Sequence, residues 1–214
     1  MINIPIPAGN TGEVVESFIG PPGLYIHSPF CQSICPFCPY NKVLYDRNLV
    51  ESYFNALEQE LDWYFGAINE PFLSLYVGGG TPTLCLEELA QIMDKLSVTG
   101  ERAIEVLPNH ATKDNVVRLH DMGINYISLG IQSFNEAVLK YLERPNTAQQ
   151  NYDALKTVAG KFDCVDVDLM FDIEFNDESI FLHDFELCLQ AGIEQISTYP
   201  LMRFGYTPFG KSKH

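Results

Sequence analysis

The sequence predicts an α/β protein built on a parallel β-sheet, and three observations support this fold class. Short apolar runs alternate with longer segments whose apolar residues recur at the period of a helix. Six such runs occur, which fits six βα units joined by right-handed crossovers. The pattern Gly-Ile-x-x-Ile-Ser occurs at 123–128 and again at 192–197, and each copy predicts a helix that ends on glycine before a buried strand.

The expected strands are the apolar runs, at 23–27, 72–77, 103–107, 126–130, 164–170 and 195–199. The helices are expected between them, with apolar stripes within 48–64, 86–96, 116–122 and 180–191. Such units form either an open doubly wound sheet or a curved partial barrel. In both architectures ligands bind at the carboxyl ends of the strands.

Composition limits the function classes. The chain has 214 residues, 46% of them hydrophobic, and a net charge of −15, so it suits one sizeable core and not a nucleic-acid partner. It lacks both a membrane-length apolar run and a secretory leader, which predicts a cytoplasmic protein without a membrane partner. Residues 1–22 are expected to be an irregular lead-in, 23–201 the core domain, and 202–214 the start of a C-terminal extension.

Three of the six cysteines gather in the run CQSICPFC, as Cys31, Cys35 and Cys38. The run begins four residues after the first expected strand, at the face where ligands bind. Three thiolates can hold a [4Fe–4S] cluster by three of its irons and leave the fourth open to a small chelating ligand. Zinc with a distant fourth ligand is the alternative, although zinc modules usually show two CxxC pairs.

Four blocks in order carry a family resemblance: YIHSPFCQSICPFC at 25–38, YVGGGTPT at 76–83, ISLGIQSF at 127–134 and DVDLM at 166–170. Together they resemble radical S-adenosylmethionine (SAM) enzymes, and within them the group of oxygen-independent coproporphyrinogen III oxidases and their relatives. The resemblance implies a partial (β/α)6 barrel. It also implies reductive cleavage of SAM by a [4Fe–4S] cluster, which yields a 5′-deoxyadenosyl radical.

The resemblance also assigns site residues. Cys31, Cys35 and Cys38 would ligate the cluster, and no residue is assigned a catalytic role of its own. The residues expected to contact SAM are Tyr25 and Phe37 beside its methionine and adenine ends, Gly79, Gly80 and Thr81 at its amino group, Glu105, Gln132 and Arg144 at its polar groups, and Asp168 near the adenosyl group.

Some of these residues also stand out in the sequence itself. Glycines let a backbone approach a ligand closely and leave N–H groups exposed, although a plain glycine turn is the alternative for 78–80. Glu105 is a lone acid in an apolar strand, and a buried carboxylate needs a partner. Asp166 and Asp168 alternate, so both side chains point to one face of the strand.

Three departures from the group limit the functional prediction. Pro39 and Tyr40 stand where the oxidases carry a further cysteine, and FDIEF at 171–175 replaces a Gly-Leu-Pro turn. The group's C-terminal domain is expected to be missing or truncated. The expected substrate is therefore an unidentified small organic molecule, with a tetrapyrrole as one candidate, and the expected reductant is a donor such as flavodoxin or ferredoxin. A haem chaperone with little turnover and a radical SAM methyltransferase are the alternatives.

Overall fold

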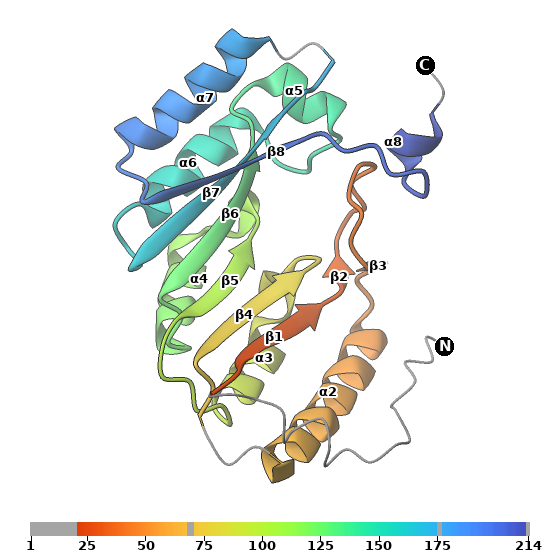
Figure 1. The fold of residues 1–214 in the computed structure, drawn as a ribbon, viewed down its shortest axis with the longest axis vertical. Helices are drawn as coiled ribbons and strands as arrows, with labels where there is room; N and C mark the ends of the chain where they lie inside the picture. Colours follow the sequence, from red (N-terminus) through yellow and green to blue (C-terminus); the bar gives the residue numbers. More distant parts are fainter. Residues whose placement is uncertain (1–20, 68–70, 175–176, 213–214) are drawn as a thin grey trace.

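The sheet is the framework of the molecule in this computed structural model, which describes residues 21–67, 71–174 and 177–212. Its six strands are all parallel: β1 (Gly23–Ser28), β4 (Ser74–Gly79), β5 (Arg102–Val106), β6 (Tyr126–Gln132), β7 (Cys164–Phe171) and β8 (Gln195–Pro200). They pair in chain order, β1-β4-β5-β6-β7-β8 (Figure 1). A doubly wound sheet reverses its order at a switch point, so this order identifies the curved partial barrel.

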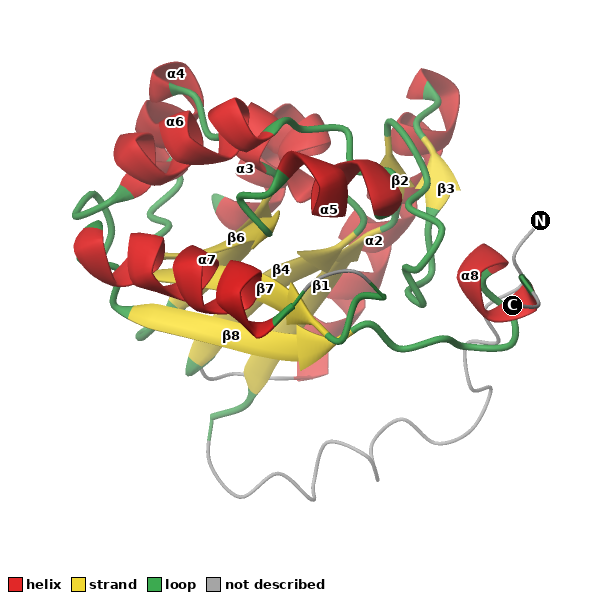
Figure 2. Ribbon diagram, turned by 90° about the horizontal axis from the view of Figure 1, so that it is seen from above, coloured by secondary structure: helices red, strands yellow, loops and turns green. Residues whose placement is uncertain are grey.

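The helices α3, α4, α5, α6 and α7 lie on one side of the sheet (Figure 2). The helical elements are α2 (Arg47–Ala67), η1 (Pro82–Cys85), α3 (Leu86–Met93), η2 (Pro108–His110), α4 (Lys113–Asp121), α5 (Glu136–Tyr141), α6 (Ala148–Val158), α7 (Glu178–Gln190) and α8 (Pro208–Lys211). Strand residues such as Val77, Ile127 and Val165 are fully buried in the core. The opposite, concave side of the sheet is left to form a site.

The six expected strands are confirmed, with shifts of one or two residues at most ends. The pattern Gly-Ile-x-x-Ile-Ser also behaves as predicted, since Gly123 and Gly192 have φ of +74° and +72° and lie between the end of a helix and the start of β6 or β8. A separate parallel pair, β2 (Phe30–Cys31) with β3 (Val43–Leu44), was not predicted. The expected lead-in lies mostly in residues 1–20, which are outside the described residues.

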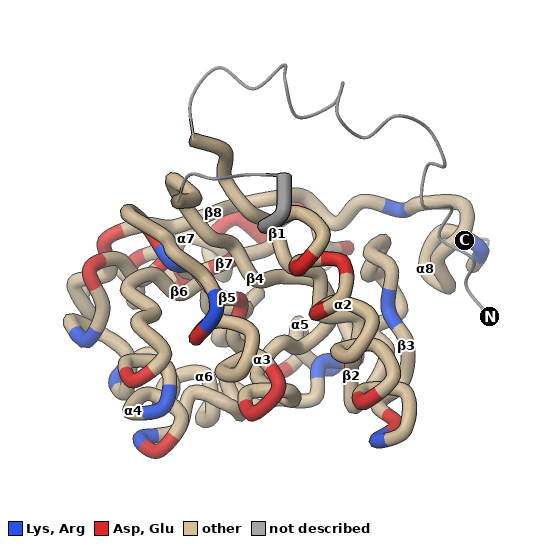
Figure 3. Tube along the Cα trace, turned by 90° about the horizontal axis from the view of Figure 1, so that it is seen from below, with Lys and Arg blue, Asp and Glu red and all other residues tan. Residues whose placement is uncertain are grey.

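The charge distribution fits the acidic composition. In the view of Figure 3, Lys and Arg are interspersed with Asp and Glu along the trace. Among the helices that the structure describes, none combines the length and apolarity needed to cross a bilayer.

A buried carboxylate ties α7 to the end of β6. Asp184 is 1% exposed and accepts hydrogen bonds from Ser133 Oγ at 2.5 Å and from the Phe134 backbone N–H at 2.9 Å. Replacing Asp184 with alanine leaves both buried donors without an acceptor. We therefore expect the free energy of unfolding, measured by urea denaturation, to fall by about 3 kcal/mol. Glu186→Ala, at an exposed position on the same helix, is the control and should change it little. Equal stabilities of the two variants would contradict this account.

Candidate functional site

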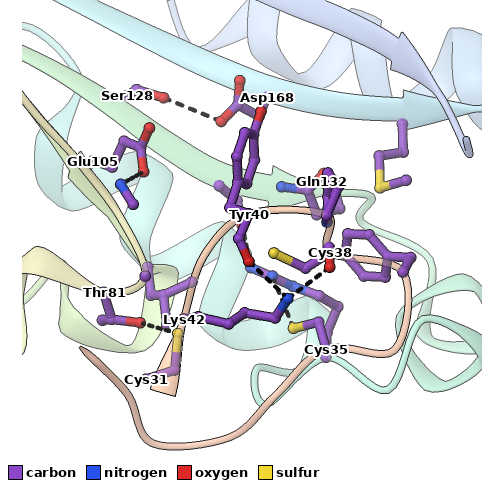
Figure 4. Close-up of a pocket in the computed structure, with 18 of the residues that line it drawn as sticks. Cys31, Cys35, Cys38, Tyr40, Lys42, Thr81, Glu105, Ser128, Gln132 and Asp168 are labelled. Carbon is purple, nitrogen blue, oxygen red and sulfur yellow. Dashed lines mark hydrogen bonds between the residues drawn. The ribbon is translucent and has the colours of Figure 1, made fainter. Parts of the chain in front are cut away.

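A cavity of about 460 Å³ opens at the carboxyl ends of the strands. Its lining includes most of the site residues predicted from the sequence: Cys31, Cys35, Phe37, Cys38, Gly79, Gly80, Thr81, Glu105, Gln132, Arg144 and Asp168. Figure 4 shows several of them converging from the cysteine loop and from separate strands. The fold thus brings together residues that lie more than a hundred positions apart in the chain.

Tyr25 is the exception among the predicted site residues, because it is not part of the cavity lining. It lies mid-strand in β1, is 55% exposed, and stacks at 6.1 Å on Tyr76, which does line the cavity. Its hydroxyl lies 2.9 Å from His27 Nδ1, and His27 Nε2 lies 2.8 Å from the Asn41 carbonyl. With Nε2–H as the donor to that carbonyl, Tyr25 and His27 anchor the far end of the cysteine loop.

The cysteine loop runs between β2 and β3, and its three thiols are free. Thr81 Oγ1 donates to Cys31 Sγ at 3.9 Å, and Arg144 Nη1 donates to Cys35 Sγ at 3.6 Å. Burial raises the pKa of the Cys31 thiol, and the Thr81 hydrogen bond opposes this shift. Donors to sulfur are among the features that tune an iron–sulfur centre.

The donor set fits a [4Fe–4S] cluster. Within the described residues, no group of three or more His, Cys, Asp or Glu side chains is placed to hold one metal ion. A [4Fe–4S] cluster binds each thiolate at a different iron, so its ligands need not converge on one atom. Three cysteines that share a cavity, with hydrogen-bond donors at two of the sulfurs, satisfy that requirement.

The glycine loop after β4 is held against Glu105. The Gly79 backbone N–H donates to Glu105 Oε2 at 3.0 Å, and the Tyr76 hydroxyl donates to Oε1 at 3.2 Å. Burial raises the pKa of the Glu105 carboxyl, while these two hydrogen bonds oppose the shift. Gly79 has φ of +118°, a conformation that favours glycine. Glu105 therefore finds the partners that its place in an apolar strand requires.

Gly80 packs directly against the cysteine loop, which makes it a test of the site. A Cβ at this position would lie 2.7 Å from the Phe30 carbonyl oxygen and 2.9 Å from Cys31 Sγ. We expect Gly80→Ala to displace the loop and to lower the iron bound per chain after anaerobic reconstitution to less than about half of the wild-type value. Gly205→Ala, where an added Cβ meets no atom within 4 Å, should bind iron normally. Normal iron uptake by Gly80→Ala would refute this close packing.

The inner wall of the cavity is acidic. Asp168 Oδ2 accepts from Ser128 Oγ at 3.1 Å, and Asp166 Oδ2 accepts from Ser197 Oγ at 2.7 Å. Burial, followed by the charge of Asp166, raises the pKa of Asp168 to about 7. Ser128 and Ser197 are the serines of the two Gly-Ile-x-x-Ile-Ser copies, so the repeat places polar residues in the site as well as marking strand starts.

A second polar group lies at the carboxyl ends of β6 and β8. Gln132 has φ of +69° beyond a register shift in β6, and its Oε1 accepts from the Tyr199 hydroxyl at 2.5 Å. Arg144 Nη2 donates to the Gly130 carbonyl at 2.8 Å, while Arg144 Nε is buried without a partner among the described residues. A buried guanidinium N–H without a partner indicates a place for an acceptor from a ligand.

Sequence reasoning missed several residues of the lining. Tyr76 and Ser128 each lie between two buried apolar residues, so a period-two analysis of their strands would have found them. Tyr199 lies between Thr198 and Pro200 and gave no such signal. Lys42 and Tyr40 gave no such signal, because they lie in a loop. In Figure 4 the ring of Tyr40 points toward Asp168.

Comparison with known proteins decides the family. The profile of the Radical SAM superfamily matches residues 25–183. The chain belongs to the radical SAM superfamily. The heme chaperone HemW of Bacillus subtilis (strain 168) is 30% identical over 188 residues, which are 83% of this chain and 50% of that protein. The oxygen-independent coproporphyrinogen III oxidase of Synechocystis sp. (strain ATCC 27184 / PCC 6803 / Kazusa) is 27% identical over 202 residues, 89% of this chain and 43% of that protein.

The solved structures agree with this radical SAM assignment. Coproporphyrinogen III oxidase (HemN) from Escherichia coli superposes with a TM-score of 0.82 at 24% identity, covering 93% of this chain and 48% of HemN. This radical SAM chain spans about half the length of the curated relatives that it matches. The cofactors of the superfamily are a [4Fe–4S] cluster and SAM, and more distant structural neighbours contain them.

Proposed function

We propose that this chain is a radical SAM catalytic core that uses a [4Fe–4S] cluster to cleave SAM reductively. The substrate is an unidentified organic molecule, and tetrapyrroles are the first class to test because the relatives named above act on or carry them by name. The observation that carries the proposal is the single cavity shared by Cys31, Cys35 and Cys38, the glycine loop and Arg144. The substrate class, the electron donor and the partners of this chain are likewise proposed.

The roles of the residues follow from their positions around the cavity. Cys31, Cys35 and Cys38 would hold the cluster, which when bound supplies the electron that breaks a carbon–sulfur bond of SAM and yields a 5′-deoxyadenosyl radical. The loop at Gly79, Gly80 and Thr81 would receive the amino group of SAM at the edge that Glu105 stabilises. These are binding and orienting roles, which the protein supplies while the cofactors carry the chemistry.

The remaining contacts would orient the rest of SAM. Arg144, with its unpaired buried Nε–H, would donate to a carboxylate or ribose oxygen of SAM, and Gln132 would contact the same part of SAM. Asp168 would receive hydroxyl donors of the adenosyl group, and Phe37, a lining residue of the cysteine loop, would pack on the adenine. Tyr25 would contribute through Tyr76 and His27 and not by direct contact.

The test is turnover of the reconstituted protein. Anaerobic loading with iron and sulfide, followed by dithionite and SAM, should release 5′-deoxyadenosine, measured by chromatography. Arg144→Met is expected to lower this release, and Arg118→Met, at an exposed helix position, should not. A fully loaded cluster that releases no 5′-deoxyadenosine would refute the cleavage activity.

A haem chaperone with little turnover is the second candidate, favoured by the HemW relative at 30% identity over 83% of the chain. Pro39 and Tyr40, in place of the further cysteine expected for the oxidases, support the same alternative. Titration with haem separates the two functions. A shifted Soret band with little 5′-deoxyadenosine supports the chaperone, and an unchanged haem spectrum excludes it.

A further inference from the structure

Lys42 is a charged residue of the cavity to which the proposed cofactor binding gives no role. It lines the cavity, lies four residues beyond Cys38, and is partly buried. Its Nζ donates to the Cys38 carbonyl at 2.6 Å and to the Tyr40 carbonyl at 3.1 Å. Figure 4 shows its side chain extending along the cysteine loop with the ammonium group between these two carbonyls.

The surroundings of Lys42 are strongly negative. Glu105, Asp166 and Asp168 line the same cavity, and the whole chain carries a net charge of −15. Among the described residues that line the cavity, Lys42 and Arg144 supply the Lys and Arg positive charges. Arg144 is held against the Gly130 carbonyl and Cys35 Sγ, whereas Lys42 is held against the loop at the third cysteine. The two positive charges therefore lie beside different cysteines, Arg144 at Cys35 and Lys42 at Cys38.

The charge near an iron–sulfur cluster influences how readily it accepts an electron. Reduction adds negative charge, so nearby carboxylates oppose it and a nearby ammonium favours it, most strongly where water is excluded. Lys42 is fixed by two hydrogen bonds, one to the carbonyl of Cys38 and one to the carbonyl of Tyr40, so its charge keeps a constant position beside the cysteine loop.

We propose that Lys42 is a charge-tuning residue that raises the reduction potential of the cluster held by Cys31, Cys35 and Cys38. The inference rests on the proposed function, because it requires that cluster. It assigns Lys42 a positioning and electrostatic role and no contact with substrate.

The experiment is a redox titration of anaerobically reconstituted protein, with the reduced cluster quantified by electron paramagnetic resonance. Lys42→Gln keeps a hydrogen-bond donor without the charge, and Lys42→Arg keeps the charge. At the potential where half of the wild-type clusters are reduced, we expect the ratio of reduced to oxidised cluster to fall about tenfold in Lys42→Gln, equivalent to about 59 mV for a one-electron couple. Lys42→Arg should stay close to wild type.

Lys156→Gln is the matched control, because it makes the same change in net charge at an exposed position. Lys156 lies in the last turn of α6, which precedes the start of β7 at the opposite end of the sheet, and its replacement should leave the ratio unchanged.

The iron content of each variant distinguishes a failure of this inference from a failure of the proposed function. An unchanged ratio in fully loaded Lys42→Gln overturns the inference, and so does poor iron uptake by that variant, which would make Lys42 a purely structural loop residue. A wild-type chain that takes up no cluster refutes the proposed function itself, and this inference with it.

Discussion

Replacing Cys35 with serine is expected to abolish formation of the [4Fe–4S] cluster. Cys35 lines the cavity, and its Sγ accepts a hydrogen bond from Arg144 at 3.6 Å. A serine hydroxyl is a poor substitute for a thiolate, and two cysteines leave a cube under-ligated. We expect iron per chain after anaerobic reconstitution to fall by at least about tenfold relative to wild type. The absorption of the cluster near ~400 nm should disappear in parallel.

Cys164→Ser is the matched control for this loss. Cys164 is also free and partly exposed, but it lies at the first residue of β7, at the opposite end of the strands from the cavity. It should bind as much iron as wild type. Equal iron in the Cys35 and Cys164 variants would show that the cysteine loop is not the cluster site.

Asp168→Asn is expected to stabilise the cofactor-free protein at high pH. Burial, reinforced by the charge of Asp166, raises the pKa of Asp168 from 3.8 to about 7. Between these two values the folded state binds more protons than the unfolded state, so the stability of the wild type falls as pH rises. Above pH 7 the full cost of holding the charge is present, and below the unfolded value it is absent.

The neutral amide removes that cost. Urea denaturation at pH 8 should show Asp168→Asn more stable than wild type by on the order of 2–4 kcal/mol, and the difference should shrink toward zero near pH 4. Asp163→Asn, at an exposed position just before β7, is the control for removing one carboxylate. A stability difference that is the same at pH 8 and pH 4 would contradict the assigned charge environment.

Much of the fold was predictable because its signals are local. Period-two and period-3.6 patterns located the six strands and four of the helices, and glycines with positive φ marked two helix ends. The helix α6 was missed although Thr147 and Gln150 form a capping box, which is a readable start signal. The β2 and β3 pair was not predictable, because each strand has two residues and pairing depends on the folded loop.

The site residues also fall into two groups, those that local sequence signals predict and those that only the fold brings together. The cysteines and the glycine run were predictable, because their chemistry requires those residue types at fixed spacing. The pairing of Ser128 with Asp168 was not, because the register of neighbouring strands decides which polar residues meet. Lys42 was not predictable either, since a loop lysine usually has its charge in water and only the folded loop turns it toward Cys38.

The strand order has a mechanical consequence. β1 and β8 are the two edges of the described sheet and do not pair with each other. A closed barrel would have to break a ladder of backbone hydrogen bonds to widen, whereas this incomplete ring can widen through a change of twist alone. The separation between the first and last strands of the described sheet can therefore change without the loss of any strand pairing.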